Sequence, residues 1–241
     1  MSVLSLFLIT IVVSVVTALV LGVRAVARRA LPPAEARVVV RRAIGFFAVW
    51  LGTSAVVAAT GVLRDFDARP PRLMILVVAS FAVLTIVTRT ARFKALLAAT
   101  PPSWPVALMS MRVPIEIGLW GLFATGKLPV HMTFEGRNFD VLVGATAPVV
   151  AWALARGKLG RAGLVAWNVA SLGLLANIVG MAVTTIPGPL HLPWPGVSNT
   201  VVADFPWVWL PTFLVPVAVF GHVVSLRQVL AGRVSSSRAP A

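Results

Sequence analysis

The sequence predicts an all-α fold, a bundle of about seven transmembrane helices with the N-terminus outside the membrane and the C-terminus inside. Of the 241 residues, 59% are hydrophobic and 12% are charged, whereas about a quarter of the residues in a soluble domain are charged. Apolar runs of about 18 to 22 residues recur, each long enough to cross a hydrocarbon core of about 30 Å as a helix. Basic residues gather in alternate segments between these runs. Together these observations indicate a polytopic membrane protein.

The apolar runs give the expected elements in chain order. We predict helices at 3–23, 43–63, 73–90, 104–125, 140–155, 163–184 and 206–226. The runs are continuously apolar rather than alternating, which favours helices over the strands of a barrel. Residues 1–226 are therefore predicted to form one transmembrane domain, and the polar segment 227–241 a short disordered cytoplasmic tail.

Lysine and arginine residues set the predicted orientation. With the N-terminus outside, the outer loops hold five of the 21 basic residues, and Arg112 lies inside a span. The inner segments hold the other 15, which are Arg24, Arg28, Arg29, Arg37, Arg41, Arg42, Arg89, Arg92, Lys94, Arg156, Lys158, Arg161, Arg227, Arg233 and Arg238. This split predicts an N-out, C-in topology under the positive-inside rule.

Charge and residue usage exclude several classes of function. A net charge of +14 would suggest nucleic acid in a soluble protein, but here most of it would face the inner leaflet, so anionic lipid is the expected partner. The chain has no cysteine, which excludes disulfides and thiolate metal sites. Its three lysines fall in loops and no two histidines share helical mid-depth, which argues against retinal and bis-histidine haem. We expect no cofactor and no nucleic acid.

An arginine and a glutamate lie inside the predicted fourth helix, in the stretch "MRVPIEIGLWGLF". Arg112 and Glu116 are four residues apart, so they share a helix face and can form an ion pair. A charge at mid-membrane costs roughly 2.5 to 3.5 kcal/mol on insertion scales, so such residues face a partner or a wet cavity. They are candidates for binding or catalysis, with Arg112 binding an anionic or carbonyl group and Glu116 relaying a proton. The alternative is an internal salt bridge that fixes helix packing.

Prolines predict breaks in three of the helices. Pro114 lies between the two charged residues and cannot donate to the carbonyl of the residue four positions earlier, and Pro148, Pro211 and Pro216 act likewise in the fifth and seventh helices. Broken helices at depth line cavities or pack on protein. We therefore expect a polar cavity bounded by 104–125, 140–155 and 206–226, with Asn177 as a further binding candidate.

Two stripes of small residues predict helix-packing faces. Such residues let helix backbones approach closely in lipid. One stripe lies on 43–63 and the other on 163–184, and their members are Gly45, Ala48, Gly52, Ala55 and Ala59, then Ala170, Gly173, Asn177, Gly180 and Thr184.

The second concentration of polar residues is predicted outside the membrane, where "HMTFEGRNFD" spans His131 to Asp140. The binding candidates in the outer loops are Glu135, Arg137, Asn138, Asp140 and Asp204. His131, Glu135 and an aspartate are a conceivable metal set, but Gly136 and Pro129 favour a loop over the helix that would align them. We therefore predict no metal site, and instead a salt-bridge network centred on Arg137. His222, near the inner end of the last helix, is interpreted as an interfacial polar residue.

The segments "RVPIEIGLW", "MTFEGRNFDVLVGATAP" and "DFPWVWLPTFLVPVAVFGHVVSLRQ" resemble those of an uncharacterised family of bacterial seven-helix integral membrane proteins with R-x-P-x-E, F-E-G-R-N-F-D and F-P-x-x-W-L-P stretches. The resemblance covers most of the chain from the second helix onward and implies a shared fold and a bacterial inner-membrane location. "VPIE" is also similar to the proline-glutamate motif of small membrane-bound lycopene cyclases, although those enzymes have a second acidic residue where this chain has Ile117.

Three functions are compatible with these patterns. The first is binding or translocation of a small solute, lipid or proton through a cavity around Arg112 and Glu116. The second is a membrane enzyme that acts on an isoprenoid or lipid, with Glu116 as general acid or base tuned by burial. The third is a structural subunit of a larger membrane complex. Whether the chain is an enzyme stays open at this point.

Overall fold

The protein is all-helical in the residues that its structure, a computed structural model, describes, which are 1–234. Six helical segments are long and apolar enough to cross a membrane: Val3–Ala30, Pro33–Ala59, Arg72–Arg89, Ser103–Ala124, Arg161–Thr185 and Leu210–Leu230. The predicted span 140–155 is helix α7, Val141–Ala155, which at 15 residues is about 22 Å long. By length alone α7 falls short of the hydrocarbon core, so the structure gives six clear candidates and one shorter apolar helix.

The first half of the chain forms two long helices and a shorter pair. Helix α1 spans Val3–Ala30 and α2 spans Pro33–Ala59, so the second helix starts ten residues before its predicted limit. Proline opens α2, where its missing N–H costs no helical hydrogen bond. Helix α3 spans Arg72–Arg89, and α4, Ala91–Ala99, is a nine-residue helix in a segment that we had predicted as an inner loop. Thr90 caps α4 by accepting from the Phe93 N–H at 3.1 Å, which satisfies one of its free first-turn donors.

The predicted fourth span is interrupted, as its proline suggests. Helix α5 covers Ser103–Leu108, a 3₁₀ turn covers Met109–Met111, and helix α6 covers Arg112–Ala124. Pro114 is the third residue of α6, within the first turn, where the helix has no intrahelical acceptor for an N–H. The break therefore falls immediately before Arg112.

The last span is also irregular. A π-helical turn, Leu210–Leu214, precedes helix α9, Val215–Leu230. Pro216 leaves the carbonyl of Thr212 without its helical donor, and the indole N–H of Trp50 in α2 donates to that oxygen at 2.9 Å. In return the indole N–H of Trp209 donates to the carbonyl of Leu51 at 3.0 Å. Two reciprocal indole bonds thus join α2 to the π-helical turn.

The predicted tail from 227 onward needs a correction at its start. Helix α9 continues to Leu230, and Arg227 Nη1 donates to the carbonyl of Thr88 at 2.6 Å. Gln228 is fully buried and its Nε2 donates to the carbonyl of Thr100 at 2.7 Å. These bonds tie the end of α9 to the ends of α3 and α4. The remainder of the predicted tail, 235–241, lies outside the described residues.

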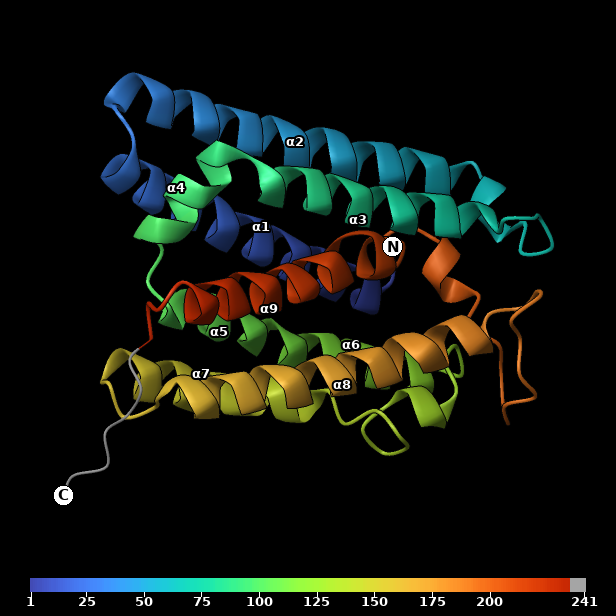
Figure 1. The fold of residues 1–241 in the computed structure, drawn as a ribbon. Helices are drawn as coiled ribbons and strands as arrows, with labels where there is room; N and C mark the ends of the chain where they lie inside the picture. Colours follow the sequence, from blue (N-terminus) through green and yellow to red (C-terminus); the bar gives the residue numbers. More distant parts are fainter. Residues whose placement is uncertain (235–241) are drawn as a thin grey trace.

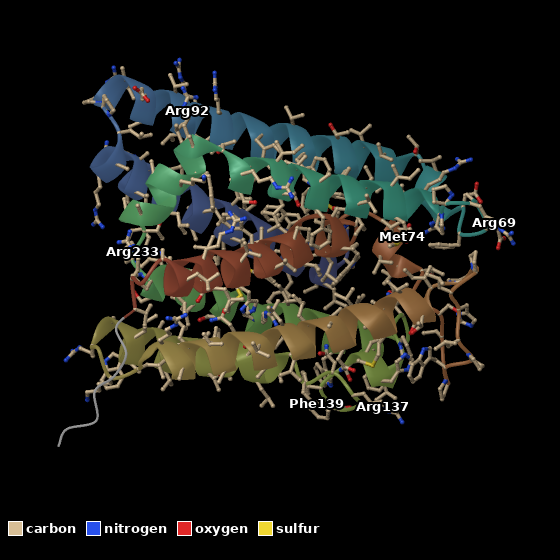
Figure 2. The ribbon with its side chains drawn as sticks, in the orientation of Figure 1. Arg69, Met74, Arg92, Arg137, Phe139 and Arg233 are labelled. Atoms are coloured by element: carbon tan, nitrogen blue, oxygen red, sulfur yellow. The ribbon has the colours of Figure 1, made fainter. Side chains whose placement is uncertain are left out.

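The helices form a bundle of roughly three layers (Figure 1). Helices α2 and α3 lie along one side, α7 and α8 (Arg161–Thr185) lie along the other, and α1, α5, α6 and α9 run between them. The main hydrophobic core lies in this middle layer and includes Leu8, Met109, Leu122 and Leu214. Arg92 and Arg233 lie at one end of the bundle and Arg69 at the opposite end (Figure 2).

The glycines of the two predicted stripes of small residues do not pack on another helix of this chain. A Cβ built on Gly45, Gly52, Gly173 or Gly180 would have no neighbour within 4 Å, and these glycines are exposed. The close approaches occur at other glycines. At Gly144 in α7 a Cβ would lie 2.7 Å from the backbone nitrogen of Val113. The stripe prediction was therefore wrong for close helix packing at these glycines, because spacing alone does not tell which helix face meets a neighbour. In the second stripe, Asn177 and Thr184 instead form hydrogen bonds with Arg137 and Trp194.

Candidate functional site

Arg112 is paired with Asp140 rather than with Glu116. Its Nη1 donates to the Oδ1 of Asp140, which directly precedes α7, and both side chains are buried. The sequence suggested Glu116 because residues four apart share a helix face. The structure instead brings Asp140, 28 positions along the chain, to the guanidinium, so the candidate ion pair is a tertiary contact between α6 and α7.

Gly144 lets α7 approach the start of α6. Besides its closeness to the Val113 nitrogen, a Cβ at this position would lie 3.2 Å from the Cβ of Arg112. Asp140 lies one helical turn before Gly144, so the same approach carries its carboxylate to the guanidinium. The side-chain Oδ1 of Asn138 accepts the backbone N–H of Asp140 at 3.1 Å, a local bond of the type that Asn commonly forms at turns.

Glu116 is held by the loop that precedes α7, which the sequence predicts to lie outside the membrane. The Nδ2 of Asn138 donates to the Oε2 of Glu116 at 2.5 Å and to the carbonyl of Met132 at 3.1 Å. Asn138 thus uses its amide nitrogen for Glu116 and its amide oxygen for Asp140. One asparagine thus joins the carboxylate of Glu116 to the backbone N–H of Asp140.

On the other side of Arg112 the contacts continue into α9 and α8. Arg112 Nη2 lies 3.0 Å from the Nε2 of His222, and His222 Nδ1 lies 2.8 Å from the Oδ1 of Asn168. The Nδ2 of Asn168 donates to the carbonyl of Leu164 and to the Oγ of Ser225, so its Oδ1 is left to accept. His222 therefore carries its proton on Nδ1 and accepts from Arg112 through Nε2.

These side chains form one continuous buried network, which we call the polar cluster. Its members are Arg112, Glu116, Asn138, Asp140, Asn168, His222 and Ser225, and none is more than 4% exposed. A guanidinium is not deprotonated in proteins and an amide has no titratable proton, so neither passes a proton along a chain. The hydrogen bonds of the polar cluster thus join α6, α7, α8 and α9, while the Nε of Arg112 is buried without a hydrogen-bond partner.

The other predicted site residues lie elsewhere. Asn177 is exposed and donates to the carbonyl of Arg137 at 2.9 Å, so it is not part of the polar cluster. Glu135 is exposed and accepts from the indole N–H of Trp120 at 2.8 Å. Asp204 forms an ion pair with Arg64 at 2.7 Å. Of the eight binding candidates, four converge and four do not.

Arg137 does not centre a salt-bridge network. Its guanidinium lies over the ring of Trp194, 5.7 Å from the ring centroid, and the ion pairs within 1–234 join other residues. The described residues contain no group of three or more His, Asp or Glu side chains that would bind a metal ion. The predicted outer loops are joined by aromatic contacts and hydrogen bonds instead.

His131 belongs to this outer layer and is buried. Its ring stacks on that of Trp194, with centroids 4.6 Å apart, and its Nε2 lies 2.9 Å from the Oγ1 of Thr185. Burial lowers the pKa of His131, and the positive charge of Arg137 lowers it further. His131 is therefore held as a neutral packing residue.

The large cavity is apolar and lies on the opposite side of α6 and α9 from the polar cluster. It has a volume of about 1110 Å³ and is lined by α1, α2, α3, α4, α5 and α9, with Pro114 and Pro216 among its wall residues. The prediction of a polar cavity bounded in part by 140–155 was therefore wrong, because the space is apolar and no residue of α7 lines it. Neither Arg112 nor Glu116 lines it. A cavity of this size slightly exceeds the usual ligand-pocket range of about 300 to 1,000 Å³.

The hydroxyl groups in the cavity wall are already used by the helices that carry them. Each donates to a backbone carbonyl three or four residues earlier in its own helix or the turn next to it. They belong to Thr10, Ser14, Ser80, Thr100 and Thr212. These side chains present carbon rather than a free donor to the space, so the long wall is suited to an apolar molecule.

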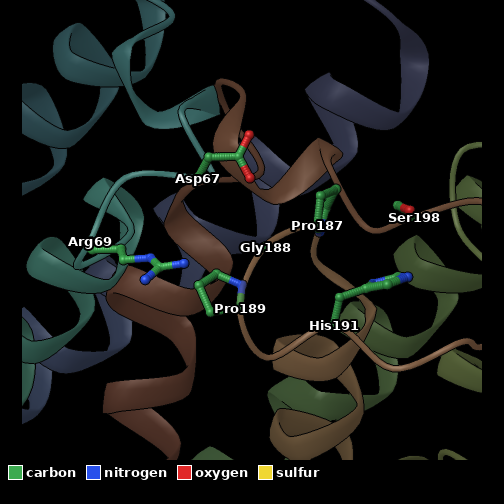
Figure 3. A pocket seen from close by; sticks show the side chains of 7 residues that line it. All are labelled: Asp67, Arg69, Pro187, Gly188, Pro189, His191 and Ser198. Atoms are coloured by element: carbon green, nitrogen blue, oxygen red, sulfur yellow. The ribbon is translucent and has the colours of Figure 1, made fainter.

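A smaller pocket of about 390 Å³ lies between the outer loops (Figure 3). Its wall includes Asp67, Arg69, His191 and Ser198. Gly188, with φ of +122°, permits the loops to meet, since a Cβ there would lie 2.6 Å from the carbonyl oxygen of Phe66. The charged residues that line the pocket are exposed, which leaves the apolar cavity as the better-formed site.

Comparison with known proteins gives no match. No protein-family model matches the chain, and neither a curated protein nor a solved structure does. The resemblance to a bacterial membrane-protein family therefore stays a prediction from motifs. Function has to be argued from the polar cluster and the apolar cavity.

Proposed function

We propose that this chain is a seven-pass protein of the bacterial inner membrane, N-terminus outside and C-terminus inside, that binds a lipid or another elongated apolar molecule in the apolar cavity. The observation that carries the proposal is the cavity itself, about 1110 Å³ of space between α1, α2, α3 and α9. Such a space inside a membrane domain is accessible to molecules dissolved in the bilayer. Of the solute, lipid and proton considered from the sequence, the lipid fits these walls best.

The polar cluster supports the proposal as scaffold rather than as ligand site. A buried ion pair that is joined to further buried hydrogen bonds helps to fix the arrangement of the helices that carry it. Here it fixes α6 and α9, which contribute Pro114 and Pro216 to the cavity wall. The polar cluster holds α6, α7, α8 and α9 together. The cavity lies between this group of helices and the pair α2 and α3.

Binding is better supported than catalysis by the same geometry. A general acid or base must come within about 2.6 to 3.2 Å of the proton it transfers, directly or through one water. Glu116 lies in the polar cluster with Asn138 as its partner and does not line the apolar cavity. A lipid in the cavity would therefore not meet this carboxyl group.

The test is to fill the cavity and measure retained lipid. The variant carries Ser14→Phe and Gly22→Phe, two cavity-lining positions of α1, and a Cβ on Gly22 would meet no atom within 4 Å. The control carries Ala166→Phe and Gly173→Phe, two exposed positions of α8 that do not line the cavity. After purification in mild detergent, native mass spectrometry and solvent extraction give the lipid bound per protein.

We expect the wild-type protein and the α8 control to retain the same amount of lipid, and the α1 variant to retain less. Circular dichroism and gel filtration check that both variants are folded. Equal retention in all three proteins, or no retention by the wild type, would contradict the proposal.

A further inference from the structure

We infer that the occupant of the apolar cavity is an anionic membrane lipid, with its headgroup at Arg42 and its chain directed along α1. This inference rests on the proposed function and specifies the class of ligand. Three features support it: the length of the cavity, the position of its polar end and the charge around that end.

The cavity is elongated along the bundle. On α1 its wall extends from Phe7 to Val26, which at 1.5 Å per residue is about 28 Å of helix. Toward one end of the cavity, Trp50 is the last lining residue on α2, and its indole donates to the carbonyl of Thr212, which also lines the cavity. This pair offers no free polar group to the space, which suits a hydrocarbon chain.

The other end of the cavity is polar. Among the described residues that line the cavity, Arg42 alone is charged. It lies on α2 immediately before the apolar stretch that begins at Ala43, the position of a membrane boundary. Trp104, at the start of α5, lines the same end, and aromatic rings of this kind favour the headgroup level. An amphiphile placed in the cavity would therefore have its headgroup at Arg42.

The charge around this end is positive. Arg42 is exposed and takes part in none of the ion pairs within 1–234. The guanidinium of Arg29 lies over the ring of Trp104, 5.8 Å from its centroid. A guanidinium binds phosphate oxygens through charge-assisted, often bidentate hydrogen bonds. A phospholipid with net negative charge matches this positive end of the cavity. A zwitterionic phospholipid fits less well, because its headgroup also carries a cation that the arginines repel.

The experiment measures headgroup preference. Purified protein is equilibrated with mixed micelles that contain equal amounts of phosphatidylglycerol and phosphatidylcholine with the same acyl chains, and native mass spectrometry gives the ratio of the two bound lipids. We expect the wild type to favour phosphatidylglycerol by about tenfold, which corresponds to about 1.4 kcal/mol in binding free energy. Both lipids offer phosphate oxygens to Arg42, but the choline cation of phosphatidylcholine is repelled by the positive charge at this end.

The variants separate a specific site from general surface charge. Arg42→Gln is expected to bring the ratio close to one while the total lipid bound stays the same, and Arg42→Lys to keep part of the preference. Arg41→Gln is the matched control, since Arg41 is exposed on the same helix and does not line the cavity. Arg41→Gln should retain the wild-type ratio.

The outcomes distinguish this inference from the proposed function. If lipid is retained without preference, if Arg42→Gln keeps the preference, or if Arg41→Gln lowers it equally, the headgroup assignment is overturned and lipid binding stands. If the wild type retains no lipid, or the Ser14→Phe and Gly22→Phe variant retains as much as the wild type, lipid binding in this cavity fails and the headgroup assignment fails with it.

Discussion

His222 accepts a hydrogen bond from Arg112 at 3.0 Å across 110 positions of the chain. The histidine lies in α9 and the arginine at the start of α6, so the bond joins the last helix to the break in the fourth span. Asn168 fixes the tautomer that makes His222 an acceptor here. The bond therefore depends on the relative positions of three helices, α6, α8 and α9.

Replacing His222 tests this relationship. His222→Leu leaves an N–H of Arg112 and the Oδ1 of Asn168 buried without their partner. Each unsatisfied buried group costs about 1 to 3 kcal/mol, and more when charged, so we expect a loss of about 3 kcal/mol in unfolding free energy. Thermal or denaturant unfolding of the detergent-solubilised protein measures it. His191→Leu, at an exposed histidine of the outer loops, is the control and should unfold like the wild type.

Asp140→Asn is expected to be among the most destabilising single changes. It removes the carboxylate charge that pairs with the buried guanidinium of Arg112, and breaking a buried ion pair from one side costs about 3 to 5 kcal/mol. Glu135→Gln, at an exposed carboxylate, should have little effect. The double variant Arg112→Met with Asp140→Leu should recover part of the loss, because neither charge is then left buried alone. Equal stability of Asp140→Asn and wild type would contradict the pairing.

Gly144→Ala tests the close approach of α7 to α6. The added methyl would lie 2.7 Å from the Val113 nitrogen and 3.2 Å from the Cβ of Arg112. Overpacking of this kind costs about 1 to 3 kcal/mol. Gly173→Ala, where the methyl meets no atom within 4 Å, should be neutral or stabilising by up to about 1 kcal/mol because alanine favours the helix. Similar unfolding midpoints for the two variants would rule out a tight contact at Gly144.

His131 predicts a loss of stability at mildly acidic pH. Its pKa in the folded protein is lowered from 6.5 by burial and by Arg137. Above pH 6.5 both folded and unfolded states are neutral at this residue and it adds no pH dependence. As the pH falls below 6.5 the unfolded chain binds the proton first, so folding becomes less favourable until the lowered pKa is passed.

The measurement is the unfolding midpoint of wild type and His131→Gln between pH 8 and 5. The variant should start less stable, since it loses the stacking on Trp194, and should fall less steeply over the acidic part of the range. Parallel curves would show that His131 does not contribute to the pH dependence.

Hydropathy predicted most of the long helices, because a helix that crosses a bilayer needs a continuous run of apolar residues. It could not place α4, whose residues Arg92 and Lys94 resemble those of a basic loop. Hydropathy also placed the end of the last helix at 226. In the structure the helix continues, and Arg227 and Gln228 donate to the carbonyls of Thr88 and Thr100 at the ends of α3 and α4. The bonds of Arg227 and Gln228 depend on carbonyls that are distant in sequence, and a hydropathy average over neighbouring residues carries no information about them.

Four of the seven members of the polar cluster were predicted as site residues from the sequence, but the pairing of Arg112 with Asp140 was not. Arg112 and Asp140 were both candidates, but the i,i+4 rule describes an isolated helix and therefore favoured Glu116 over a tertiary partner. His222 was interpreted as an interfacial residue. The available signal was its spacing of three from Ser225, which places two polar side chains on one face of an apolar helix. The apolar cavity has no sequence signature, since its walls have the composition of any lipid-facing helix.

The two indole bonds between α2 and the π-helical turn give Pro216 a role beyond breaking a helix. Trp50 donates to the carbonyl of Thr212, and Trp209 donates to the carbonyl of Leu51. A residue with an N–H at position 216 would compete with the Trp50 indole for the Thr212 oxygen. The proline therefore keeps that acceptor free for a bond that fastens two walls of the apolar cavity to each other.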